Sequence, residues 1–309
     1  MRARHRGAAV AIALALAASA CQGASTGASA DGWTPPRTPD GQPDLQGVWT
    51  NYTATPFEVP DERDDLALYS GDTDGTGRGT GPAAFLTDTT GRTLAKGRSL
   101  VVDPPNGRVP ILPWAEEQRT FKLLHIQDHW EHHTPWERCI TRGVPGGIFP
   151  TGYGSGYQIL QGPGYVAIVY EMIHEARIIP TDSRPHVGSG IRLWNGDSVG
   201  RWDGDTLVVD IANYNDKGSI ATNAATQRVR SIPQSQDLHV VERFTRVDEN
   251  TIDYEATIED PKVFTAPWRV AIPLHREPDY RIFEYACHEG NLAIPNTLSA
   301  GRALRVRPR

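Results

Sequence analysis

The sequence is poor in sulfur-containing residues and has no excess of positive charge. It contains three cysteines and two methionines in 309 residues, and its formal net charge is −6. A nucleic-acid-binding protein needs a basic face, so we expect no nucleic-acid partner. Beyond residue 20, no apolar run approaches the length of about eighteen residues that indicates a membrane-spanning helix.

Several catalytic fingerprints are also absent. The sequence has no Gly-x-Ser-x-Gly nucleophile elbow, no P-loop, and no dinucleotide-binding fingerprint after a strand-forming stretch. These absences argue against chemistry that depends on such motifs, and we expect no cofactor.

The first twenty-one residues have the pattern of a secretory signal. Three arginines precede a short apolar run at residues 8–18, and small residues lead directly into Cys21. This arrangement is similar to a bacterial lipobox, so we expect removal of residues 1–20 and lipidation of Cys21. Cleavage nearby, with Cys21 as a bystander, is the alternative. Residues 21–43 are rich in small residues, glycine and proline, and read as a tether.

This pattern predicts a periplasmic or outer-membrane-associated protein with a lipid anchor. Removing residues 1–20 also removes three arginines and no acidic residue, so the mature chain would carry a charge of about −9. Such a charge does not attract anionic lipid, so the anchor would hold the membrane through its acyl chains.

Two cysteines, Cys139 and Cys287, remain once Cys21 is assigned to lipid. In an oxidising compartment we expect a disulfide between them, with two buried free thiols or a catalytic thiol as alternatives. The bond would close a loop of about 150 residues and stabilise the fold by about 5 kcal/mol in the chain-entropy model.

Short strand-forming stretches separated by turn residues dominate the chain, which contains 30 glycines and 24 prolines. One helix is expected at residues 114–133. The pattern predicts an all-β fold, either an antiparallel barrel of the lipocalin or calycin type or a sandwich, in one domain over residues 44–309. The expected strands cover residues 45–52, 99–102, 108–112, 157–160, 165–170, 175–180, 198–202, 206–211, 238–247, 251–259, 268–274 and 280–287.

A set of motifs spread over the chain resembles a large, uncharacterised family of secreted bacterial β-rich proteins. The resemblance implies an extracytoplasmic β fold and no particular activity. In addition, Gly-Val-Trp at residues 47–49 is similar to the start of lipocalin-type barrels. The family motifs lie at residues 43–49, 102–108, 139–145, 170–171, 197–210, 241–244, 259–261, 267–268 and 284–291.

Asp182, Arg184 and His186 alternate along the chain after an expected strand. In an extended segment alternate residues share one face, so a carboxylate, a guanidinium and an imidazole would be presented together. We expect His186 to transfer protons, and Arg184 and Asp182 to bind substrate. A polar loop with a local salt bridge is the alternative.

Glu284 and His288 lie on either side of Cys287. Glu284 interrupts the apolar stretch 282–286, where a carboxylate is costly unless it is paired or functional. We expect Glu284 to be catalytic and His288 to bind substrate. A structural ion pair of Glu284 with Arg243 or Arg281 is the alternative.

Glu171 and Glu242 are two further carboxylates in or beside apolar strands, where a charge is costly unless it is paired or functional. We therefore expect them to be catalytic as well. Trp194, Trp202 and Trp268 could form an aromatic wall for an apolar or sugar-like ligand, although core packing is the alternative for all three.

Four histidines, His125, His129, His132 and His133, follow one another near the end of the expected helix. On a helix they would share one broad face, where two or three imidazoles could meet a metal. No third ligand and no His-Glu-x-x-His motif accompany them. We therefore interpret them as a polar helix end and expect no metal.

The sequence thus predicts an envelope-anchored protein that handles a small organic ligand in a β-barrel cavity. One hypothesis is a cofactor-free acid–base enzyme, a lyase, isomerase or hydrolase. The other is a non-catalytic binding lipoprotein for an apolar ligand.

Overall fold

The structure is a computed structural model that describes residues 32–53, 55, 57–59, 99–151, 154–221 and 231–306. The predictions of a signal peptide at residues 1–20, of lipidation at Cys21 and of the first part of the tether, residues 21–31, lie outside the described residues. Within these ranges, no helix has both the length and the hydropathy to cross a membrane.

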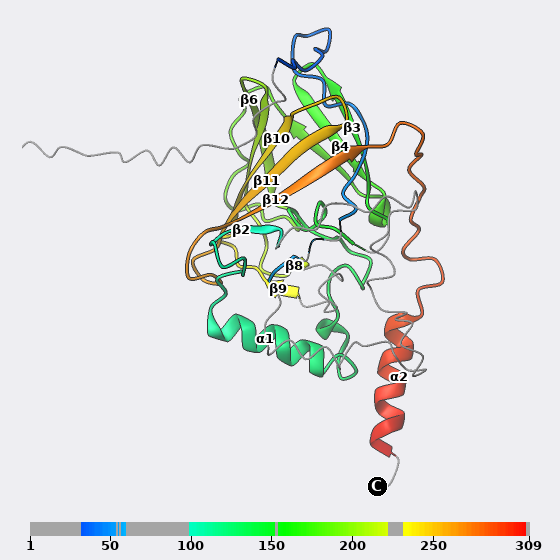
Figure 1. Ribbon diagram of the computed structural model, residues 1–309. Coiled ribbons are helices and arrows are strands. Elements are labelled where there is room, and N and C mark those ends of the chain that lie inside the picture. Colours follow the sequence, from blue (N-terminus) through cyan, green and yellow to red (C-terminus); the bar gives the residue numbers. More distant parts are fainter. Residues whose placement is uncertain are drawn as a thin grey trace, which may run out of the picture.

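Nine antiparallel strands form a nearly closed barrel, as the sequence predicts (Figure 1). They pair in the order β5-β4-β3-β1-β12-β11-β10-β7-β6, and β2 pairs with β12 beside this path. The strands are β1 (Gly47–Thr50), β2 (Val101–Asp103), β3 (Gly156–Gly162), β4 (Tyr165–Tyr170), β5 (Ala176–Pro180), β6 (Asp197–Asp203), β7 (Thr206–Ala212), β10 (His239–Arg246), β11 (Thr251–Glu259) and β12 (Trp268–Arg276).

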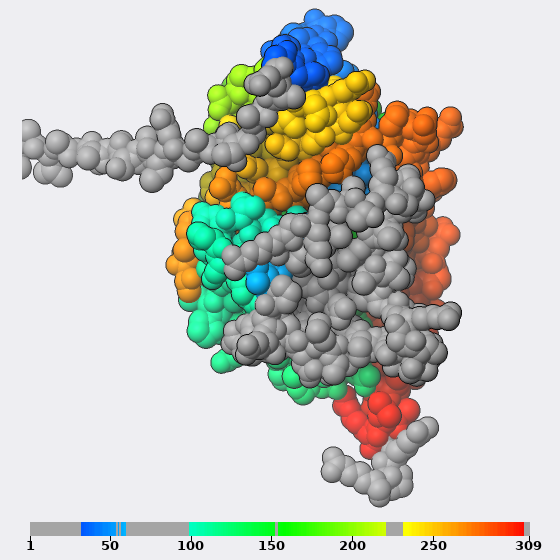
Figure 2. All heavy atoms as spheres, in the orientation of Figure 1, coloured from blue at the N-terminus to red at the C-terminus, as the bar shows by residue number. Residues whose placement is uncertain are grey.

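The remaining elements cover one end of the barrel and extend away from it. Helix α1 lies beyond this end with the small β8–β9 sheet, and α2 projects from the body at the end of a long irregular segment (Figures 1 and 2). These elements are α1 (Pro113–Leu124), η3 (Trp130–His132), η4 (Met172–His174), β8 (Ser219–Ala221), β9 (Ser231–Pro233) and α2 (Ala293–Val306).

Alternation of polar and apolar residues positions the barrel core. In β10 and β11 every second residue is buried, and the intervening residues are partly or fully exposed. Because successive strand residues point to opposite faces, one set fills the interior and the other faces outward. Aliphatic and aromatic side chains, among them Tyr157, Phe244 and Trp268, form one continuous buried cluster. The barrel interior is therefore occupied by the protein's own side chains.

Strands β5 and β6 are the two ends of the sheet path, and they meet through side chains. The Arg177 Nε on β5 donates to the Ser198 Oγ on β6 at 2.9 Å. Gly200 on β6 allows a close approach, since a Cβ at this position would lie 2.8 Å from a methyl group of Ile179 on β5. The barrel is thus closed at this seam by packing and a side-chain bridge.

A buried ion pair crosses the barrel interior from this seam. The Arg177 Nη1 lies 2.6 Å from the Glu242 Oε2 on β10, and Glu242 is fully buried. The Tyr254 hydroxyl on β11 donates to the Glu242 Oε1 at 2.8 Å. Burial lowers the pKa of Arg177, but the adjacent Glu242 carboxylate outweighs it and raises that pKa. The guanidinium therefore stays charged and paired.

Three local expectations differ from the structure. The two strands expected at residues 99–102 and 108–112 do not pair with each other, because β2 pairs with β12 and Ile111 bridges to Phe264. The expected last strand, residues 280–287, forms no strand, and Phe283 within it is 67% exposed. The expected helix ends at Leu124 rather than at residue 133, and the sequence did not predict α2.

Removing one member of the buried ion pair is expected to destabilise the barrel more than removing both. Glu242→Gln leaves a buried guanidinium without its counter-charge and should lower the free energy of unfolding by about 3–5 kcal/mol. The double variant Arg177→Met/Glu242→Leu should lose less, because no charge remains buried. Urea unfolding followed by tryptophan fluorescence measures both. A double variant less stable than Glu242→Gln would contradict this account.

Candidate functional site

The predicted site residue His186 lies on the outer surface of the barrel, in the loop between β5 and β6. Its Nδ1 is 2.8 Å from the Asp197 Oδ2, and its Nε2 is 2.7 Å from the Asp210 Oδ1. The His239 Nε2 contacts the other oxygen of Asp210 at 3.0 Å. Both nitrogens of His186 therefore contact carboxylates of this network. Its predicted role in proton transfer to a substrate stays a prediction.

Asp182 and Arg184 form a local, exposed ion pair with each other. The Arg184 Nε donates to the Asp182 Oδ1 at 2.8 Å, and its Nη2 donates to Oδ2 at 2.6 Å. These hydrogen bonds lower the pKa of Asp182 to about 2. The geometry matches the salt-bridged loop that the sequence left open as the alternative.

The three expected catalytic carboxylates have no binding partner in common. Glu242 belongs to the buried pair inside the barrel. Glu171 is buried just after β4, where the Tyr280 hydroxyl donates to its Oε1 at 2.7 Å and the Gly156 amide to its Oε2 at 3.2 Å. Glu284 lies exposed in the irregular segment after β12, as does His288.

The three tryptophans differ in their surroundings. Trp268 is 1% exposed and packs edge-on against Phe57 and Phe264 in the core. Trp202 is partly buried against the same core, and Trp194 is partly buried in the loop before β6. At Trp268, the structure matches the core-packing alternative.

The histidines after α1 do not share a helical face, since the helix ends at Leu124 and the chain turns before η3. His125 contacts Asp128, and the His132 Nδ1 contacts the His125 carbonyl. Among the described residues, no three or more His, Cys, Asp or Glu side chains are grouped to hold a metal ion.

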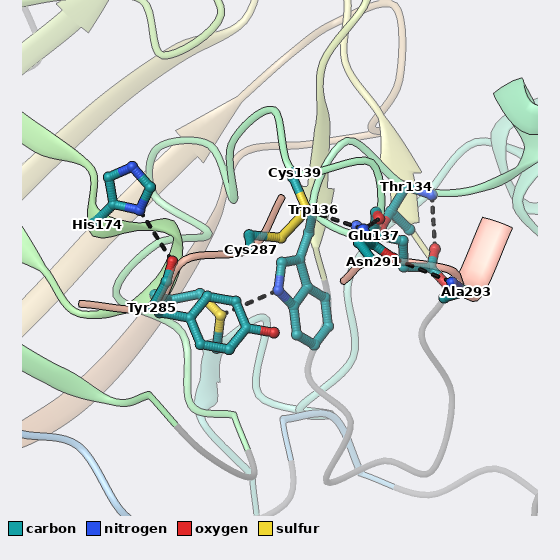
Figure 3. Close-up of a disulfide and its surroundings, with 10 residues drawn as sticks. Thr134, Trp136, Glu137, Cys139, His174, Tyr285, Cys287, Asn291 and Ala293 are labelled. Atoms are coloured by element: carbon teal, nitrogen blue, oxygen red, sulfur yellow. Dashed lines mark hydrogen bonds between the residues drawn. A yellow bond between two sulfur atoms is a disulfide. The ribbon is translucent and has the colours of Figure 1, made fainter. Parts of the chain in front are cut away.

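A groove of about 630 Å³ lies outside the barrel, between the loop after η3 and the segment that leads to α2. This volume is within the range of small-molecule sites. We define the groove by five of its lining residues, Ile126, His133, Trp136, Glu137 and Tyr285. Figure 3 shows Trp136 and Tyr285 from the two walls beside the disulfide.

The Cys139–Cys287 disulfide forms, as the sequence predicts, and joins the two walls of the groove. The Asn291 Nδ2 donates to the Glu137 carbonyl at 3.3 Å, and the His174 Nδ1 contacts the Tyr285 carbonyl at 3.0 Å (Figure 3). The C-terminal segment is therefore attached to the same loop that carries His133 and Glu137.

A capping box fixes the position of Glu137 in this loop. The Glu137 amide donates to the Thr134 Oγ1 at 3.1 Å, and the Thr134 amide donates to the Glu137 Oε2 at 2.7 Å. The other carboxylate oxygen, Oε1, lies 3.6 Å from the His133 Nδ1. Burial raises the pKa of Glu137, but the contacts with His133 and Thr134 outweigh it and lower that pKa. Glu137 is thus an anion beside the imidazole.

The other ring nitrogen of His133 has no hydrogen-bond partner among the described residues. His133 is 5% exposed, and its Nε2 is fully buried. His133 also lines both the groove and a smaller adjacent pocket. An imidazole with a carboxylate at Nδ1 and a free Nε2 at a cavity is the arrangement of a general base. The 3.6 Å contact is longer than a hydrogen bond, as is common in unliganded sites.

Three of the five described non-glycine residues with positive φ lie near this groove, and the other two, Ser183 and Asn213, lie elsewhere. Cys139, Ile173 and His174 all have φ values between 45° and 63°, in the left-handed region. For residues other than glycine this conformation costs roughly 1–2 kcal/mol each. Such strain clusters at functional sites, where the surrounding structure holds it in place.

Sequence reasoning considered His133 only as a metal ligand and missed Glu137. The signal that identifies them is the Thr-x-x-Glu spacing of Thr134 and Glu137, which predicts a capping box and directs the carboxylate back along the chain. The groove itself was not predictable, because its walls lie about 150 residues apart in the sequence.

Comparisons of the chain with protein-family models, with curated proteins and with solved structures find no match. The functional argument therefore depends on the geometry of the described residues.

Removing the disulfide is expected to destabilise the protein strongly. Cys139→Ser/Cys287→Ser opens a loop between residues 148 positions apart, which corresponds to about 5 kcal/mol in the chain-entropy model. Urea unfolding measures the change, and the wild type under reducing conditions is the matched control. An unchanged midpoint would show that the bond does not stabilise the fold.

The His186 network is expected to make stability depend on pH. Burial opposes the imidazolium, but hydrogen bonds to Asp210 and Asp197, with their negative charges, raise the pKa of His186 above 6.5. Its stabilisation is therefore complete below pH 6.5 and is lost as the pH rises through the raised pKa. Asp210 has a lowered pKa and stays ionised throughout.

Unfolding free energies between pH 6 and 9 test this expectation. The wild type should lose stability across the range, and His186→Gln should lose less over the same range. His129→Gln removes an exposed histidine outside the network and should follow the wild type. Parallel curves for His186→Gln and the wild type would refute the assignment.

Proposed function

We propose that this chain is an envelope-anchored protein that binds a small organic ligand in the groove and transfers a proton to or from it. His133 is the acid–base group, and Glu137 orients and stabilises its imidazolium. The observation that carries this proposal is the buried Nε2 of His133, which has no hydrogen-bond partner among the described residues and belongs to a residue that lines the groove.

The proposal keeps the cofactor-free acid–base chemistry expected from the sequence and moves it out of the barrel. The interior of the barrel is filled by core side chains, whereas the groove offers space of ligand size. Ile126, Trp136 and Tyr285 give it apolar and aromatic surface, and His133 gives it a polar group.

Of the three expected reaction classes, hydrolysis is the one that we develop, with His133 as a general base acting on water. Cys139 is held in the disulfide and is not available as a thiol nucleophile. The His133 Nε2 would take a proton from water as the water oxygen attacks an acyl carbon. The imidazolium would then return that proton to the leaving group. Glu137 would remain ionised throughout and stabilise the imidazolium.

Hydrolysis of p-nitrophenyl acetate by the purified protein tests the proposal with a defined probe. His133→Gln should reduce p-nitrophenolate release to the uncatalysed rate, because the general base is lost. Glu137→Gln should lower kcat by about tenfold to a hundredfold, since the imidazolium loses its carboxylate. His129→Gln is the matched control and should retain the wild-type rate.

Equal rates in the wild type and His133→Gln would refute the role of His133. A second measurement separates the non-catalytic alternative from the enzyme. If the wild type binds a fluorescent aromatic probe in the groove, as detected by quenching that is lost in Trp136→Ala, but turns over no ester, the protein is a binding protein for an apolar ligand.

A further inference from the structure

A second, smaller pocket of about 40 Å³ lies next to the groove, between α1, the loop after η3 and the β8–β9 sheet. It has room for a few water molecules or one small anionic group. Ile126, His133 and Glu137 line both spaces, so a ligand in the groove could extend into this pocket.

Cationic side chains outnumber acidic ones around this pocket. Four cations line it, and two carboxylates, Glu131 and Glu137, accompany them. Glu137 already contacts Thr134 and His133, and Glu131 is exposed at the surface. The cations are Arg119, Lys122, Arg138 and Lys217.

Three of these cations, Lys122, Arg138 and Lys217, have no ion-pair partner among the described residues, and Lys217 is exposed. Arg119 pairs with Glu116 at 2.6 Å, but neither Lys122 nor Arg138 has a described carboxylate within 4 Å. Both are partly buried, and the Arg138 guanidinium stacks over the Trp130 ring at 5.3 Å. Burial, followed by the charge of Arg138, lowers the pKa of Lys122. Two like charges thus face the same small space.

Apart from the Arg119 Nε, which is ion-paired with Glu116, three buried polar atoms in the lining of this pocket lack a hydrogen-bond partner among the described residues. They are the Gln118 Oε1, the His133 Nε2 and the Arg138 Nε. Buried polar groups are almost always hydrogen-bonded, so several unsatisfied atoms in one pocket indicate a missing polar occupant. The excess of cations and the donor Arg138 Nε indicate that this occupant is an anion, whereas the two acceptors, the Gln118 Oε1 and the unprotonated His133 Nε2, would be satisfied by water molecules held beside it.

We propose that this pocket, defined by Gln118, Lys122, His133 and Arg138, binds the carboxylate or phosphate group of an anionic ligand. Lys122 and Arg138 supply charge-assisted hydrogen bonds to the oxyanion. The remainder of the ligand lies in the groove beside His133. The assignment deepens the proposed function by naming its substrate class, organic acids or phosphate esters, and it rests on that function only for turnover.

Anion binding is tested without any turnover. Inorganic phosphate and acetate should each raise the Tm of the purified protein above its value in chloride at the same ionic strength. For the anion that binds more tightly, Lys122→Gln should raise the Kd by about tenfold or more, as expected for the loss of one charge-assisted hydrogen bond. Lys262→Gln removes an exposed lysine that pairs with Asp237 and should bind like the wild type.

The stability of the variant gives an independent check. In chloride, Lys122→Gln should have a Tm equal to or above that of the wild type, because it relieves repulsion from Arg138. A lower Tm would mean that the Lys122 charge is structural, and the anion site would be refuted. Equal anion affinities in Lys122→Gln and the wild type, or no stabilisation by either anion, would also refute it.

Turnover distinguishes this inference from the proposed function. For the anionic ester p-nitrophenyl hemisuccinate, Lys122→Gln should raise KM about tenfold, whereas Lys262→Gln should keep the wild-type KM and kcat. Anion binding without turnover would support the anion site and refute the proposed enzymatic activity. If the protein hydrolyses the acetate, shows no preference for the hemisuccinate and binds no anion, the anion site is refuted and the proposed enzymatic activity is supported.

Discussion

The barrel depends on the buried ion pair between Arg177 and Glu242. Strands β5 and β6 end the sheet path without a described backbone ladder between them, so side chains hold this seam. A guanidinium in an apolar interior must keep its carboxylate, because an unpaired buried charge is very costly. The pair therefore fixes the distance from β5 to β10 across the barrel. The same arrangement fills the interior, which explains why the space of ligand size lies outside it.

Much of the barrel could be predicted because its strands carry a clear local pattern. In β10 and β11 polar and apolar residues alternate, and turn residues separate the two strands. The predicted strand at residues 280–287 failed because its apolar residues are not buried by neighbours; it is held by the disulfide and by single hydrogen bonds. The pairing of the segments around residues 99–112 could not be predicted from local pattern, because β2 pairs with the distant strand β12. Hydrophobic pattern alone does not reveal such partners.

The candidate site was less predictable, since its parts come from distant segments. The sequence correctly paired Cys139 with Cys287, because only two cysteines remained. It did not reveal that this bond brings the His133 loop against the C-terminal segment. His186 was chosen because it alternates with Asp182 and Arg184 after an expected strand, and Glu242 because it is a carboxylate within an apolar strand. The structure gives each of them its own ionic partners, on opposite faces of the sheet.

The two cysteines of the disulfide enclose most of the barrel along the chain. Every strand from β3 to β12 lies between Cys139 and Cys287, so the disulfide joins the entry and exit of most of the barrel into a covalent ring. A single proteolytic nick in any loop of this ring would leave both fragments attached to each other. In a compartment that contains proteases, the barrel and the groove could stay assembled after such a cut until a reductant opened the ring.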